Sequence, residues 1–243
     1  MKLPDYLNRP ELTDAPLDYE WTRVIANGFV ANPEEDHPKL VEAVELIAFR
    51  AAYALSGECA AWVAARLQKH IDITDALLRV EAARAAIIDV RYAQLPRPQF
   101  PNPTALDPVS EPLITSLRLV SYALDYYRKL FAGAKDNRVR MMAVNSALLA
   151  EHVAPKAAGF GKWLTDALPK ARQHYPASKK GPDKEPPMAP DFYDPQFKWS
   201  AEAVKASQAR FLEQLDPAKN PYLRKPEEMR ADGFVGNPYP HLR

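Results

Sequence analysis

Apolar residues along this chain recur at intervals of three and four positions, the spacing that places side chains on one face of an α-helix. In residues 38–56, for example, Leu40, Val44, Ile47 and Ala51 fall on a single face. Several further segments show the same spacing. We therefore predict helices over residues 38–56, 58–71, 75–95, 110–132, 136–153, 160–174 and 201–215.

A few residues set the expected ends of these helices. Ser56-Gly57 is expected to end the first helix, because glycine has low helix propensity and often follows the last turn. Thr74 and Ser110 are suited to capping the third and fourth helices. Pro169 falls inside the sixth, where a proline is expected to kink the helix.

No stretch alternates apolar and polar residues with β-branched enrichment, so strands are expected to be few or absent. We predict an all-α fold, a single helical domain over residues 1–243 that forms one bundle of six or seven helices. The chain has 24 prolines and only 8 glycines, which favours stiff, extended connections. We expect an N-terminal arm over residues 1–37, an extended segment over 96–109, and an exposed or partly mobile Pro-rich connection over 176–198 that aromatic residues pin at its end.

Composition excludes several classes of protein. A net charge of +1 supplies neither the basic field of a nucleic-acid-binding protein nor a strongly acidic surface. Basic residues gather in 128–140 and 162–180, but acidic residues are interspersed among them, so we interpret both stretches as solvated helix surface. We expect no nucleic-acid partner.

The cellular location is predicted from three features. No run approaches the roughly 18 apolar residues of a membrane span, and the first residues lack the apolar core of a signal peptide. The single cysteine, Cys59, lies in an Ala-rich segment and is expected to be a small core residue, which excludes a disulfide framework. We expect a cytoplasmic protein with no membrane contact.

The sequence contains no catalytic constellation. Di-metal helical bundles need two Glu-x-x-His pairs, and only Glu34 and His37 have this spacing, in a Pro-flanked turn. Zinc-binding His-Glu-x-x-His, Gly-x-Ser-x-Gly and phosphate-binding Gly-rich patterns are absent. His70, His152 and His174 lie near predicted helix C-termini, where a cation is favourably placed. We expect no metal site, no cofactor and no enzymatic activity.

The fourth predicted helix offers a candidate binding surface. Arg118, Tyr122, Asp125 and Lys129 are spaced by four, three and four residues and share one face, with Tyr126 one turn beyond Tyr122. Tyrosine and arginine are enriched among residues that dominate binding energy at protein interfaces. We predict that these five residues contact a protein partner. The alternative, that both tyrosines are core residues whose hydroxyls reach solvent, stays open.

A short sequence, the terminal motif, occurs near both ends of the chain. Residues 6–11 (YLNRPE) and 26–33 (ANGFVANP) recur, with substitutions, as residues 222–227 (YLRKPE) and 231–238 (ADGFVGNP). Pro226 suits the first position of a helical turn, and Gly233 suits the left-handed residue that ends it. Phe234 and Val235 are then expected to fold back onto the body as an apolar clasp. The repeat has two open explanations: independent use of common turn chemistry at both ends, or an old duplication or recombination between neighbouring related genes.

The second copy carries a resemblance to a known family. Residues 220–239 (NPYLRKPEEMRADGFVGNPY) resemble the C-terminal segment of certain all-helical bacterial immunity proteins. Those proteins protect a cell from polymorphic toxins delivered by contact-dependent or type VI secretion machinery. The resemblance implies a cytoplasmic protein that neutralises a cognate toxin by binding it, with no catalytic residues. Inhibitors of nuclease toxins are often strongly acidic, so a net charge of +1 favours a non-nuclease toxin or inhibition away from the active site.

Three functional hypotheses follow. The first is an immunity protein that covers one toxin through a helical surface. The second is a structural or adaptor protein, with homo-oligomerisation left open, whose Pro-rich arms grip neighbouring molecules. The third is a helical enzyme without a recognisable motif, which a deep polar pocket holding a carboxylate with a strongly shifted pKa would favour.

Overall fold

The computed structural model describes residues 3–100, 106–178 and 181–241, and within them the protein is all-helical, as predicted. The described residues form ten α-helices: α1 (Pro10–Thr13), α2 (Arg23–Gly28), α3 (Pro38–Glu45), α4 (Phe49–Leu67), α5 (Thr74–Ile88), α6 (Ser110–Phe131), α7 (Arg138–Val153), α8 (Phe160–His174), α9 (Ala201–Leu212) and α10 (Pro226–Ala231). Short 3-10 helices are η1 (Asp5–Leu7), η2 (Val90–Tyr92), η3 (Lys156–Ala158) and η4 (Pro182–Lys184). The predicted bundle of six or seven helices is not confirmed in detail, because several of the ten are only one or two turns long.

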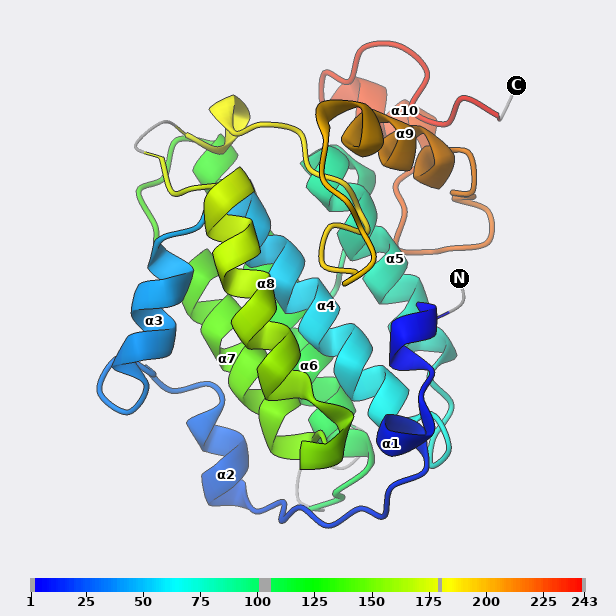
Figure 1. Ribbon diagram of the computed structural model, residues 1–243. Helices are drawn as coiled ribbons and strands as arrows, with labels where there is room; N and C mark the ends of the chain where they lie inside the picture. Colours follow the sequence, from blue (N-terminus) through cyan, green and yellow to red (C-terminus); the bar gives the residue numbers. More distant parts are fainter. Residues whose placement is uncertain (1–2, 101–105, 179–180, 242–243) are drawn as a thin grey trace.

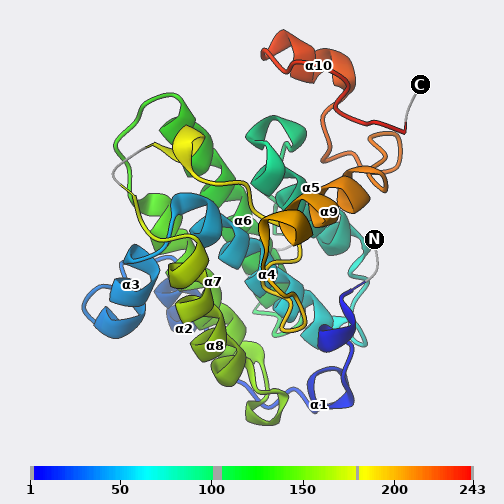
Figure 2. The same cartoon turned by 45° about the horizontal axis from the view of Figure 1, so that its top comes forward.

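Helix α4 is the centre of the molecule. It runs through the middle of the bundle, with α5, α6, α7 and α8 around it and α9 and α10 at one end (Figures 1 and 2). Every residue of α4 after Phe49 is buried, and seven of them are alanines. A helix that is apolar on all sides is one that other elements enclose, and small side chains allow those elements to approach closely.

The predicted helix break at Ser56-Gly57 is wrong. The break lies earlier, at residues 46–48, and α4 continues through Gly57. A Cβ on Gly57 would lie 3.5 Å from the Cβ of Ala83, in ordinary van der Waals contact, so α4 and α5 pack closely at this point. At the actual break, the N–H of Ala48 donates to the carbonyl of Tyr175 at 2.8 Å. Pairing with a distant segment, rather than local helix propensity, therefore decides where the chain turns.

Other helix ends differ less from the prediction. Helix α5 ends at Ile88 rather than at residue 95, because Asp89 accepts a hydrogen bond from the N–H of Arg91 at 2.9 Å and starts η2. Helix α6 matches its prediction, and Gly133 beyond it has φ 86°. Helix α8 is one continuous helix with Pro169 inside it. Of the predicted extended segment, residues 101–105 lie outside the described residues.

Three charged residues of α4, spaced eight apart, are buried and hold other segments in place: Arg50, Glu58 and Arg66. Arg66 is fully buried and binds only carbonyl groups. Its Nε donates to Val153 at 3.2 Å and its Nη1 to Ala15 at 2.7 Å, while Nη2 donates to Pro16. Burial lowers the pKa of the Arg66 guanidinium. Arg66 thus ties the N-terminal segment and the end of α7 to the end of α4.

The Pro-rich connection packs against the opposite end of α4. Glu185 is buried, and its carboxylate accepts hydrogen bonds from the N–H groups of Phe49 and Arg50 at 2.7 and 2.8 Å, which caps the helix. Burial raises the pKa of the Glu185 carboxyl. Phe192 and Tyr193 are also buried. The burial of Phe192 and Tyr193 agrees with the expected aromatic anchor at the end of the connection. The described part is exposed in stretches such as 176–178 and 195–196, but Glu185 and residues 188–190 are buried where exposure was expected, and residues 179–180 lie outside the description.

The segment predicted as an N-terminal arm, residues 1–37, lies against the body of the protein over its described part. Leu7 and Leu12 have no exposed surface, and Trp21 and Phe29 are buried as well. Rings of Trp21 and Phe29 stack with centroids 5.8 Å apart. These residues belong to the same hydrophobic core as α4, so the segment forms part of the fold.

Replacing Arg66 with methionine should strongly destabilise the protein. Methionine keeps much of the aliphatic volume but removes the donor from four carbonyl groups, the buried ones of Leu12 and Val153 and the partly buried ones of Ala15 and Pro16. The free energy of unfolding should therefore fall by about 3 kcal/mol. Arg172→Met, at an exposed position of α8, should change it by less than about 0.5 kcal/mol. Urea titrations followed by circular dichroism measure both values. Equal effects of the two substitutions would show that Arg66 does not hold these segments.

Candidate interaction surface

A groove of about 470 Å³ lies between α2 and α6. Helix α6 contributes the largest share of its lining residues, one wall comes from α2 and Val30 beyond it, and Phe100, Leu106 and Met142 of α7 complete the lining. We call it the α2–α6 groove. It lies beside the face of α6 that the sequence predicts to bind a partner.

The structure brings three of the five predicted residues together. Arg118, Tyr122 and Tyr126 line the α2–α6 groove. Asp125 and Lys129 lie beside it: Asp125 forms an ion pair with Arg97 at 3.1 Å, and the side chain of Lys129 is exposed. The partner-binding role of the set stays a prediction, but its spacing correctly placed three side chains in one groove.

Arginine side chains cover the rings of both groove tyrosines. The guanidinium carbon of Arg97 lies 4.3 Å from the ring centre of Tyr122, and that of Arg138 lies 4.2 Å from the ring centre of Tyr126. The guanidinium carbon of Arg118 lies 4.9 Å from the ring centre of Phe100. Such cation–π contacts hold the rings in fixed positions. Both tyrosines are half-buried and line the groove, and Tyr126 also packs against the hydrophobic core.

The second wall of the groove was not predicted. Helix α2 and the residues after it contribute Arg23, Ala26, Asn27 and Val30, which lie in the segment expected to be an arm. Val30 is 57% exposed and Leu106, on another side, is 48% exposed. Exposed apolar side chains next to Tyr and Arg are a feature of binding surfaces. Local periodicity could not find this wall, because α2 has only six residues.

A buried polar contact positions α2. The indole N–H of Trp21 donates at 2.8 Å to the buried carboxylate of Glu111, which lines the groove. Phe29, which follows α2, stacks on the same Trp21 ring. Thr22 caps α2 by accepting from the N–H of Ile25 at 3.2 Å. Phe29, from the first copy of the terminal motif, thus helps to hold α2 beside α6.

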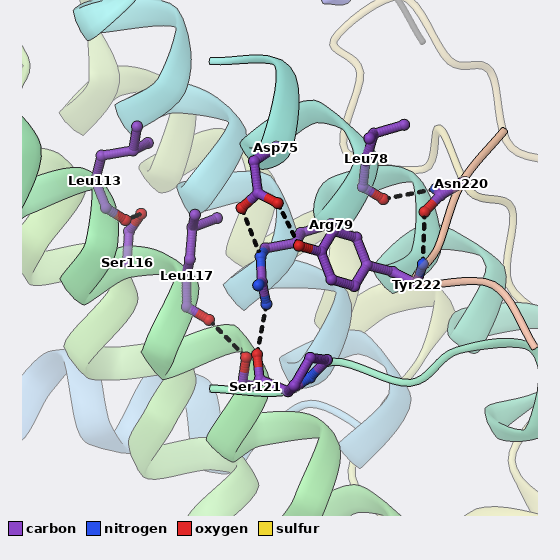
Figure 3. A network of polar contacts seen from close by, with 10 residues as sticks. Asp75, Leu78, Arg79, Leu113, Ser116, Leu117, Ser121, Asn220 and Tyr222 are labelled. Carbon is purple, nitrogen blue, oxygen red and sulfur yellow. Dashed lines mark hydrogen bonds and ion pairs between the residues drawn. The ribbon is translucent and has the colours of Figure 1, made fainter. Parts of the chain in front are cut away.

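The second copy of the terminal motif is bound to α5 and η2. Figure 3 shows Asn220 donating to the carbonyl of Leu78, at 2.8 Å, and Tyr222 lying beside Asp75 and Arg79. The Tyr222 hydroxyl donates to Asp75, which also pairs with Nε of Arg79 at 2.8 Å. Leu223 nearby is buried. The segment that carries the family resemblance is therefore packed against its own chain.

The turn chemistry predicted for this copy is confirmed in part. Gly233 has φ 79°, the left-handed value expected at the end of the turn. The ring of Phe234 packs against Tyr92 with centroids 5.6 Å apart, but Val235 is 91% exposed. Only Phe234 therefore forms the expected apolar clasp.

Both copies of the motif use their tyrosine in the same way. The hydroxyl of Tyr6 donates to Glu58 of α4, and that carboxylate pairs with Nη2 of Arg84 at 2.9 Å. This arrangement of tyrosine, carboxylate and arginine matches the one around Tyr222. Burial, together with the Glu58 charge, raises the pKa of the Tyr6 hydroxyl. Gly28, however, lies within α2 and lacks the left-handed conformation of Gly233, so the copies differ after their shared start.

The histidines and the cysteine considered in the sequence make contacts within the fold. His174 stacks on Trp199 with ring centroids 4.4 Å apart, and the His152 ring binds the carbonyl of Glu20 at 2.7 Å. Cys59 is fully buried, and burial raises the pKa of its thiol. Among the described residues, no group of three or more His, Cys, Asp and Glu could hold a metal ion. Nor does any helix in the described part have the length and apolar character to cross a membrane.

Comparison with known proteins gives no assignment. No protein-family model matches the chain, and searches of curated proteins and of solved structures found no match. Function must therefore be inferred from the sequence resemblance and from the surfaces described above.

Removal of the tyrosine hydroxyl should destabilise the protein more in the first copy of the terminal motif than in the second. Tyr6→Phe leaves a buried carboxylate without one of its donors and should lower the free energy of unfolding by about 1–2 kcal/mol. Tyr222→Phe is its matched control, because Asp75 is 57% exposed and water can replace the hydroxyl, so a loss below about 0.5 kcal/mol is expected. Denaturant titration measures both. A larger loss for Tyr222→Phe would contradict the proposed difference in burial.

Proposed function

We propose that this chain is an immunity protein, which acts in the cytoplasm by binding and neutralising a cognate bacterial toxin. It does so as a single helical domain in which the long helices form the bundle and α2 completes the binding surface. The observation that carries the proposal is the α2–α6 groove, where Arg118, Tyr122 and Tyr126 lie next to exposed Val30 and Leu106. The resemblance of residues 220–239 supports it independently.

The chemistry of the groove favours a particular kind of toxin surface. Among its described lining residues the one carboxylate, Glu111, is bound by Trp21, whereas Arg23 and Arg118 supply positive charge. Tyrosine rings and exposed aliphatic side chains provide apolar contact area. We expect the toxin to insert an apolar side chain flanked by a carboxylate. Such a mode suits a chain with a net charge of +1, because it needs no strongly acidic inhibitor surface.

Co-expression with the toxin tests this function. The protein encoded by the neighbouring gene is produced with and without this chain, growth is recorded, and the complex is isolated by affinity capture. Rescue of growth and a stable one-to-one complex are expected. A neighbour that is not toxic, or growth that is not restored, would contradict the proposal.

Substitutions in the groove then test the surface. Tyr122→Ala combined with Arg118→Glu should weaken binding by at least about a hundredfold, because alanine scanning finds losses above 2 kcal/mol at such positions. Arg172→Glu on α8 makes the same charge change outside the groove and should leave affinity unchanged. Equal affinity of all variants would place the interface elsewhere.

Light scattering of the isolated chain addresses the alternative of a homo-oligomeric structural protein. The immunity proposal predicts a monomer that associates only when the toxin is added. A stable oligomer that the double substitution in the groove dissociates would assign this surface to a second copy instead.

A further inference from the structure

A second cavity, of about 530 Å³, lies on another side of the molecule. The N-terminal segment, the middle of α4, α8 and residues 193–198 surround it. We call it the α8 pocket. It shares no lining residue with the α2–α6 groove, so it is independent of the proposed toxin surface. Its volume falls within the range of about 300–1,000 Å³ that is usual for small-molecule sites.

Aromatic rings form much of the pocket wall. The ring of Trp62 lies 5.6 Å from that of Trp163 and 6.3 Å from that of Tyr6, and Trp163 lies 6.1 Å from Tyr193. Trp62, Trp163 and Tyr193 are buried side chains of the core, which fixes the shape of the wall. Rings of this kind provide contact area for a flat, apolar group.

Two buried donors at the pocket lack acceptors among the described residues. The indole N–H of Trp62, a residue only 1% exposed, has no hydrogen-bond partner, and neither has Nε of Arg9. By contrast, the indole N–H of Trp163 donates to the carbonyl of Tyr193 at 3.1 Å. The guanidinium carbon of Arg9 lies 5.7 Å from the Trp62 ring, so the two unpaired donors are neighbours. A buried donor without a partner is unfavourable, and an acceptor on a ligand would relieve this.

Charge around the pocket favours an anionic acceptor. Among the described lining residues, Arg9, Lys162, Lys170 and Lys198 are cationic and Asp166 is the single carboxylate. Lys162 pairs with Asp166 at 2.7 Å. The half-buried Lys170 donates through its ammonium group to the carbonyls of Phe192 and Phe197 at 2.8 and 3.2 Å and holds the pocket rim in place. The described lining residues therefore carry more positive than negative charge, which favours the binding of an anion.

We propose that the α8 pocket binds a small organic anion that carries an aromatic ring. The ring packs against the aromatic wall formed with Trp163, and the anionic oxygens accept hydrogen bonds from the Trp62 indole N–H and from Arg9 Nε. The ammonium groups of Lys198 and Lys162 at the rim attract the negative charge of the ligand. Carboxylate and phosphate share this chemistry, because both offer negatively charged oxygen acceptors.

Matched probes with one ring system test the ligand class. The full chain is titrated by calorimetry and by ligand-observed NMR with 1-naphthaleneacetate, 1-naphthyl phosphate and the neutral 1-naphthaleneacetamide. At least one anion should bind one-to-one with a Kd below about 1 mM, and the amide should bind at least about tenfold more weakly. The stronger of the two anions identifies carboxylate or phosphate as the preferred group. Absence of saturable anion binding, or equal affinity for the amide, would overturn the proposal.

Substitutions test the position of the ligand. Trp62→Phe keeps a ring but removes the N–H, and Lys162→Gln frees the Asp166 carboxylate, so each should weaken anion binding by about tenfold. Lys219→Gln is the matched control: Lys219 and Lys162 are 85% and 80% exposed and pair with Asp216 and Asp166, but Lys219 lies outside the pocket. The affinity of the Lys219→Gln variant for the anion should equal that of the wild-type protein. Circular dichroism checks that each variant is folded.

The outcome is separable from that of the toxin-binding tests. Tyr122→Ala, in the α2–α6 groove, should leave anion affinity unchanged. Equal binding by wild type, Trp62→Phe and Lys162→Gln would show that the anion occupies another site and would overturn the assignment to the α8 pocket.

Discussion

The structure depends on the complete burial of α4. Its alanines allow helices to pack closely on every side, but the same helix carries Arg50, Glu58 and Arg66 into the interior. A buried charge without partners is costly, so each must be met by hydrogen bonds. The partners come both from neighbouring helices and from chain segments with little regular structure. Arg66 binds carbonyls of residues 12–16 and of Val153 in α7, and Glu58 binds Tyr6 and Arg84 of α5. The guanidinium of Arg50 donates to the carbonyls of Ile87 and Ile88 at the end of α5 and to that of Pro182.

This arrangement explains why proline-rich, glycine-poor segments surround the bundle. Extended backbone offers free carbonyl groups, which helices do not, and proline keeps that backbone extended. Both candidate sites then form where such segments lie over the helices. The residues around α2 complete the groove on α6, and the segments containing Arg9 and Phe197 complete the α8 pocket. The segments that satisfy the buried charges therefore also create the surfaces available to ligands.

Sequence patterns predicted the helical class, most of α6 and three residues of the α2–α6 groove, because these depend on residues within a few turns of one another. They failed where contacts between distant segments decide the result. Gly57 has the local character of a helix terminator, yet it lies inside α4 because α5 packs against it. The α8 pocket combines residues from Tyr6 to Lys198. No local spacing indicates that Arg9 and Trp62 meet.

Hydrogen exchange of the native protein, resolved by residue, tests the central role of α4 most directly. If the surrounding helices enclose α4, the amides of residues 54–63 should be the slowest in the chain and exchange only through global unfolding. Amides of α10, at one end of the bundle, should exchange much faster through local opening. Equal protection of α4 and α10, or faster exchange in α4, would contradict the account.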